Sequence, residues 1–176
     1  MARQLSPIEL VQNPAFGSIV LWHFTKGFQD ESVSRLVNLE LLFLVFPMIL
    51  HARTLAQIGS TFPSSGLGKL VIKLSQERED LLAIHERARS MRLLTLQSVG
   101  TALSTKIMSL NYETANVRAN EVKIPRQAER NRPHLMGAEK LGRWVARVPA
   151  SQALQACILN CGLATHLLLQ HAALRP

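Results

Sequence analysis

The chain has 176 residues, of which 47% are hydrophobic and 18% charged, and its formal net charge is +8 at pH 7. This length suits one large domain or two small ones, each with a true core. Two cysteines four residues apart exclude a disulfide-stapled secreted scaffold and favour a reducing cytoplasm. The positive charge attracts polyanions, which leaves nucleic acid and an acidic protein open as partners.

The first element in chain order is a predicted helix over residues 14–28. Asn13 can cap it, and Pro14 loses no hydrogen bond at the first helical position. Its apolar residues fall near one face at helical spacing. A cluster of polar residues, Asp30-Glu31-Ser32, then predicts a break.

A second, nearly all-apolar segment follows over residues 33–50 and is predicted to be a central helix. A helix that is apolar most of the way round is normally covered by its neighbours. Pro47 should kink or restart it. The run contains Asn38 and Glu40 and is shorter than the ~20 residues of a membrane span. We therefore expect a buried helix and no membrane.

The middle of the chain alternates helices with one change of period. Helices are predicted over 51–58, 66–74, 77–90 and 92–110, with a Ser-, Pro- and Gly-rich loop over 59–68. Residues 108–112 and 116–124 alternate between apolar and polar, which predicts two short strands joined around 113–116. Helices followed by a hairpin are the outline of a winged helix-turn-helix.

The C-terminal part begins with a polar, basic linker over 125–133 and continues with a helix over 136–148 that Pro149 ends. An apolar segment follows from Gln152. The predicted fold is mainly α, a helical domain with a winged-helix-like segment and a small β-hairpin. Its parts are N-terminal helices (1–50), the winged-helix-like segment (51–125), and the basic linker with C-terminal helices (126–176).

A search for catalytic and metal-binding patterns gives no positive result. The stretch from Ser65 to Lys69 lacks the glycine spacing and hydroxyl of a phosphate-binding loop and is better explained as a helix entry. The spacing of Cys157, Cys161 and His166 does not match that of a zinc finger. The favoured explanation of this cluster is that small residues lie on a buried helix. We therefore expect no enzyme, no cofactor and no metal.

Basic residues are concentrated between positions 118 and 147, where eight of them stand against three glutamates. Such a stretch suits phosphate contacts, and it suits a solvated face or an acidic protein interface equally well. An Arg-Trp pair within it is typical of binding hot spots, although the tryptophan would serve equally as a core residue. The candidate interface or DNA-contact residues are Arg118, Lys123, Arg126, Arg130, Arg132, Lys140, Arg143, Trp144 and Arg147.

Four short motifs occur in a fixed order. They are Asn13-Pro14-Ala15-Phe16, the run from Phe43 to His51, Glu86-Arg87-Ala88-Arg89, and Leu141-Gly142-Arg143-Trp144. In this order and spacing, residues 12–150 resemble the middle component of three-component ABC systems. These small proteins are encoded between an SMC-like ABC ATPase and an effector, and the systems resemble the Lamassu group of bacterial defences.

The resemblance implies a non-catalytic accessory subunit that bridges the ATPase and a nuclease-type effector in defence against phages or plasmids. No catalytic residue is implied, in agreement with the search for motifs. The alternative from another class is a free-standing DNA-binding regulator of winged-helix type. A regulator should form a soluble dimer alone, whereas a subunit should behave poorly without the partners that cover its apolar faces.

Overall fold

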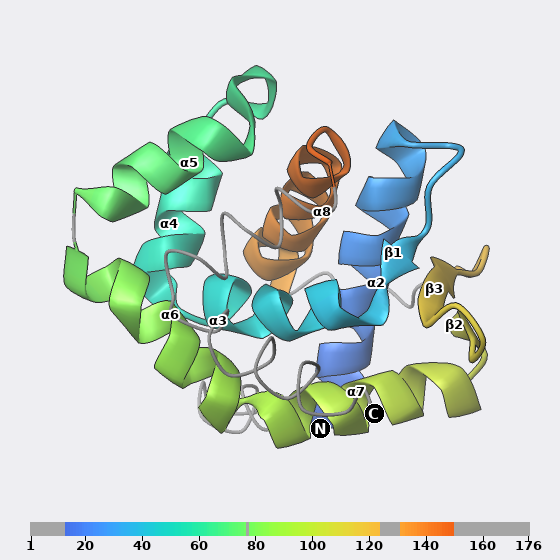
Figure 1. The fold of residues 1–176 in the computed structure, drawn as a ribbon. Helices are drawn as coiled ribbons and strands as arrows, with labels where there is room; N and C mark the ends of the chain where they lie inside the picture. The colour runs from blue at the N-terminus through green and yellow to red at the C-terminus, as the bar shows by residue number, and fades with distance from the viewer. Residues whose placement is uncertain (1–12, 77, 124–130, 150–176) are drawn as a thin grey trace, which may run out of the picture.

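A computed structural model describes residues 13–76, 78–123 and 131–149, and Figure 1 shows their arrangement. Within these ranges the chain forms seven α-helices and one three-stranded antiparallel sheet, so the predicted mainly α fold is confirmed. In chain order the elements are α2 (Pro14–Glu31), β1 (Val37–Asn38), η1 (Leu39–Leu44), α3 (Val45–Ile49), α4 (Ala52–Ser60), η2 (Pro63–Ser65), α5 (Gly66–Ser75), α6 (Arg78–Ser90), α7 (Arg92–Ser104), β2 (Met108–Asn111), β3 (Asn116–Ala119) and α8 (Arg132–Ala146).

Helix α2 begins as the sequence predicts. The side chain of Asn13 accepts hydrogen bonds from the backbone N–H groups of Ala15 and Phe16, and Pro14 occupies the first turn. The helix ends three residues later than predicted, at Glu31. Ten of its residues are buried, because α7, α8 and the sheet all pack against it. It is the central helix of the fold.

The prediction of one long helix over residues 33–50 is wrong. This run divides into β1, the 3₁₀ helix η1 and the short helix α3. Val37 pairs with Val117 on β3, and the Leu39 N–H bonds the Ala115 carbonyl, so the backbone is recruited into a sheet before a helix can start. The predicted burial holds only for the later part of the run: every residue from Val45 to Ile49 is buried, whereas Val33 and Leu36 are exposed.

The predicted hairpin is confirmed as β2 and β3, which are joined by a turn over residues 112–115. The Asn111 side chain accepts hydrogen bonds from the N–H groups of Glu113 and Thr114 and so shapes this turn. Helix α7 ends at Ser104 rather than at 110. Lys106 adopts a positive φ of 58°, and the Ile107 N–H returns to the Ala102 carbonyl, which is the Schellman helix ending.

The winged-helix-like character of residues 51–125 stays a prediction. The hairpin that it requires is present, and β1 adds a third strand in the order β1-β3-β2. The two helices before the hairpin, however, are α6 and α7, and the single residue Met91 joins them. A helix-turn-helix normally has a turn of three or four residues. Five α-helices also lie between β1 and the hairpin.

Helix α8 lies beside α2 and runs in the same direction (Figure 1). Phe16 contacts His134 at their first turns, and Glu31 pairs with Arg147 where both helices end. Glycines permit this close approach. A Cβ on Gly142 would lie 3.0 Å from the Phe28 nitrogen and would overlap the Phe24 carbonyl oxygen. Residues of all three predicted parts of the chain, such as Val20, Ile58 and Trp144, therefore share one core.

Among the described residues, no single helix has the length and apolarity to cross a membrane. The segments Leu39–Ile49 and Ala52–Ser60 reach that standard only when taken together, and they are bent by 97° where they meet.

Candidate interaction surface

A groove with a volume of about 1030 Å³ runs along the side of α8 that faces α4. Its lining comes from the start of α2, the end of α3, one face of α4, the turn before α5, and α8. The residues are Phe16, Leu50, Ala52, Leu55, Ala56, Gly59, Pro63, Arg132, Pro133, His134, Met136, Gly137, Glu139, Lys140 and Arg143. Most of these side chains are apolar, and the charged ones all belong to α8.

The floor of the groove forms because α4 and α8 approach closely near Gly137. A Cβ at this position would meet the Leu55 side chain at 2.8 Å. Beside it Met136 is 58% exposed, and its side chain adds to the apolar lining of the groove. Exposed apolar surface of this kind marks sites where a protein or ligand associates.

Two lysines from different helices lie at the end of α4, and one of them, Lys140, lines the groove. Lys140 of α8 donates hydrogen bonds from Nζ to the carbonyl oxygens of Ile58 (2.8 Å) and Gly59 (3.2 Å), at the end of α4. Lys73 of α5 donates to the Thr61 hydroxyl, 2.9 Å away, in the turn that follows α4. A cation beside the last carbonyls of a helix stabilises that helix end.

The two lysines also act on one another. Burial lowers the pKa of Lys140, and the nearby Lys73 cation lowers it further. Within the described part of the chain, neither lysine pairs with a carboxylate. The end of α4 therefore concentrates positive charge that only carbonyl and hydroxyl oxygens, and no described carboxylate, offset.

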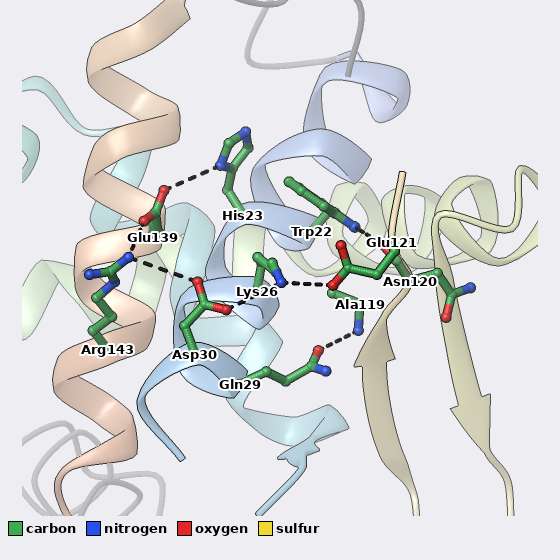
Figure 2. Close-up of polar contacts among 10 residues, drawn as sticks. All are labelled: Trp22, His23, Lys26, Gln29, Asp30, Ala119, Asn120, Glu121, Glu139 and Arg143. Carbon is green, nitrogen blue, oxygen red and sulfur yellow. Dashed lines mark hydrogen bonds and ion pairs between the residues drawn. The ribbon is translucent and has the colours of Figure 1, made fainter. Parts of the chain in front are cut away.

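Helix α8 is also tied to α2 by ion pairs, and Figure 2 shows the one between Arg143 and Asp30. Arg143 lies 2.6 Å from a Glu139 oxygen and 3.8 Å from an Asp30 oxygen, and Arg147 lies 2.9 Å from Glu31. The Arg147 hydrogen bond lowers the pKa of the Glu31 carboxyl.

His23 of α2 faces the same Glu139, 3.8 Å away. Burial lowers the pKa of His23, and the carboxylate only partly opposes this effect. The histidine is therefore held towards its neutral form between the two helices.

The eight basic residues among the nine candidates fall into three groups. Arg118, Lys123 and Arg132 are exposed and make no ion pair with another described residue. Lys140, Arg143 and Arg147 are engaged by carbonyls or carboxylates of the same chain. Arg126 and Arg130 lie outside the described residues. Three of the six described candidate cations are thus already engaged within the chain.

Trp144 belongs to the core rather than to the surface. Its side chain is 1% exposed, and its Nε1–H donates a 2.8 Å hydrogen bond to the Pro63 carbonyl. The hot-spot interpretation is wrong for this side chain, because a residue buried inside the chain cannot insert into a partner. The alternative, a core tryptophan, is what the structure shows. Its neighbour Arg143 does remain exposed.

Groups of side chains that could hold a metal ion are not found among residues 13–76, 78–123 and 131–149. The cluster of Cys157, Cys161 and His166 lies outside these ranges. Glu40, the carboxylate in the apolar run, is exposed.

Sequence reasoning missed two features of the groove. Met136 was assigned to a helix, but nothing in its local pattern shows that it stays exposed above α4. Lys73 was not grouped with Lys140, because the two residues are 67 positions apart and meet only where α4 ends. The i, i+4 spacing of Arg132, Met136 and Lys140 was the available signal for a common face.

Fold and surface together define a small helical protein with an open, mainly apolar groove and a cationic end. Comparison with protein families gives the particular assignment: residues 2–157 match the model of the ABC-three component (ABC-3C) system Middle Component 3. The chain belongs to this family and is a middle component of a three-component ABC system. No curated protein and no solved structure matches the sequence.

Proposed function

We propose that this chain is a non-catalytic subunit that bridges the SMC-like ABC ATPase and the effector of a three-component defence system in the cytoplasm. Family membership supports the association with two other components. The observation that carries the proposal is the open groove between α4 and α8, whose apolar floor and exposed Met136 suit association with another protein. A bridging subunit needs such surfaces and needs no reactive groups.

The alternative of a DNA-binding regulator depends on a continuous basic surface. Three of the nine candidate residues are engaged within the chain, which weakens phosphate binding through them. Of the nine candidates, Arg118, Lys123 and Arg132 are the described cations that remain for it. An acidic or apolar protein partner accounts for the groove, whereas DNA does not.

Bridging is tested by leaving out one component at a time. The three neighbouring genes are co-expressed with a tag on the ATPase, and complexes are purified with and without this chain. We expect the effector to co-purify with the ATPase only when this chain is present. Co-purification of ATPase and effector without it would refute the bridging role. Recovery of the chain alone, as a dimer that binds DNA in a salt-sensitive way, would replace the proposal with the regulator.

A further inference from the structure

We propose that the groove between α4 and α8 binds an acidic amphipathic helix that belongs to one of the other two components. The inference rests on the proposed function and adds the chemistry of the segment that is recognised. It is drawn from the shape of the groove, the order of side chains along α8, and the charge at the end of α4.

The groove has the form that accepts a helix. It lies between two helices, its floor is apolar, and its volume is about 1030 Å³. Along α8 the residues that line it span positions 132–143, which corresponds to about 16 Å of helix. A partner helix of about three turns would lie along this length and place one apolar stripe on the floor, as in other helix-in-groove complexes.

The groove is lined by three cations and by the carboxylate of Glu139, which pairs with Arg143. Arg132 and Lys140 therefore select the polar face of that helix. Arg132, Met136, Lys140 and Arg143 follow one another at intervals of four, four and three residues, so they form one stripe. Arg132 is exposed and has no ion pair with a described residue, and Lys140 bonds only carbonyl oxygens. Carboxylates opposite these two positions would complete the pairing, with an apolar side chain opposite Met136.

The end of α4 adds to this preference. Lys73 and Lys140 both donate to acceptors between residues 58 and 61, so two cations converge on one turn. An anion that approaches the two lysines offsets their mutual repulsion. The electrostatic contribution to binding is larger where the partner excludes water from the site. An acidic residue at one end of the bound helix supplies that anion.

Charge also argues against other occupants. A second copy of this chain would bring a net charge of +8 to a cationic groove. Residues 150–176 of the same chain contain Arg175 but no aspartate or glutamate, so they lack the complementary charge. A separate acidic helix satisfies both the apolar floor and the lysine pair.

Two matched pairs of substitutions test the inference. Met136→Asp acts on the groove, and Ile72→Asp is its control, because the two side chains are 58% and 62% exposed and only Met136 lines the groove. Arg132→Glu reverses a groove charge. Its control is Arg92→Glu, since both arginines are exposed first residues of helices. A glutamate at that position favours folding through the helix dipole.

Binding of each purified variant to the purified ATPase and, separately, to the purified effector is measured at two salt concentrations. We expect Met136→Asp and Arg132→Glu to weaken binding at least about tenfold and the controls less than about twofold. For Arg132→Glu the loss should shrink at high salt. Groove variants that bind like their controls would overturn the inference.

The bound segment is identified by placing the photoreactive amino acid p-benzoylphenylalanine at position 136 and mapping the crosslinked peptide by mass spectrometry. The expected peptide is an acidic amphipathic segment of another component. A crosslink to residues 150–176 or to a second copy would overturn the inference and leave the bridging proposal intact. If the wild-type chain captures neither component, the proposed function fails, and this inference fails with it.

Discussion

The substitution Gly142→Ala probes the contact that holds α8 against α2. The added methyl group would overlap the Phe24 carbonyl oxygen and lie 3.0 Å from both the Phe24 carbonyl carbon and the Phe28 nitrogen. All three atoms are backbone of α2, so no side-chain rotation can relieve the overlap. The two helices must separate along their length, which disturbs the packing of Trp144 and Phe24.

The expected change in the free energy of unfolding of Gly142→Ala follows from two opposing effects. Alanine is favoured over glycine inside a helix by about 1 kcal/mol. Overpacking a core typically costs about 1–3 kcal/mol and sometimes more, and a clash with backbone belongs at the upper end. We therefore expect Gly142→Ala to lower the free energy of unfolding by about 1–3 kcal/mol net, which corresponds to a Tm lower by about 3–10 °C for a chain of this size.

Gly59→Ala and Gly100→Ala are the matched controls, because both glycines lie in helices and a Cβ at either position would meet nothing within 4 Å. They should raise stability by about 0.5–1 kcal/mol. Urea unfolding followed by circular dichroism measures all three variants. If Gly142→Ala unfolds at the same urea concentration as the controls, the close approach of α2 and α8 is wrong.

Three further predictions concern stability. Trp144→Phe removes the hydrogen bond to the α4–α5 turn and leaves a small cavity, so it should lower the free energy of unfolding by about 1–3 kcal/mol. Its control, Arg143→Gln at the exposed neighbouring position, should change that free energy by less than about 1 kcal/mol. Equal effects of the two substitutions would contradict the core position of the tryptophan. Burial lowers the pKa of His23 and of His134 from 6.5, so the unfolded chain takes up more protons than the folded one once the pH falls below about 6.5. Stability should be complete above that pH and decrease as the pH falls towards 5, and the double variant with glutamine at both positions should flatten this slope in chemical unfolding. Arg35→Met should lower the free energy of unfolding by about 1–3 kcal/mol, because the guanidinium donates to the carbonyls of Ala146 and Val148 at the end of α8. Faster amide exchange at the end of α8 would confirm this prediction, and unchanged exchange would refute it.

The local sequence determined most of the helices. Asn13-Pro14 fixes the start of α2, and the apolar periodicities over 66–74 and 77–90 give α5 and α6 within one or two residues. Alternation around residues 108–119 gives the hairpin. In each case the signal lies in residues that are neighbours in the chain, so capping, spacing and turn chemistry carry it.

Only the tertiary structure decided how the apolar run over 33–50 folds and which basic residues are free. The two-residue strand β1 exists because Val37 meets Val117, 80 positions away, and no local pattern encodes that pairing. The lysines of α5 and α8 meet only where α4 ends, and Trp144 bonds the Pro63 carbonyl, 81 positions away, from within the core. Contacts between distant segments decide these features, because a periodicity shows that a side chain lies on a helix face but not what lies opposite it.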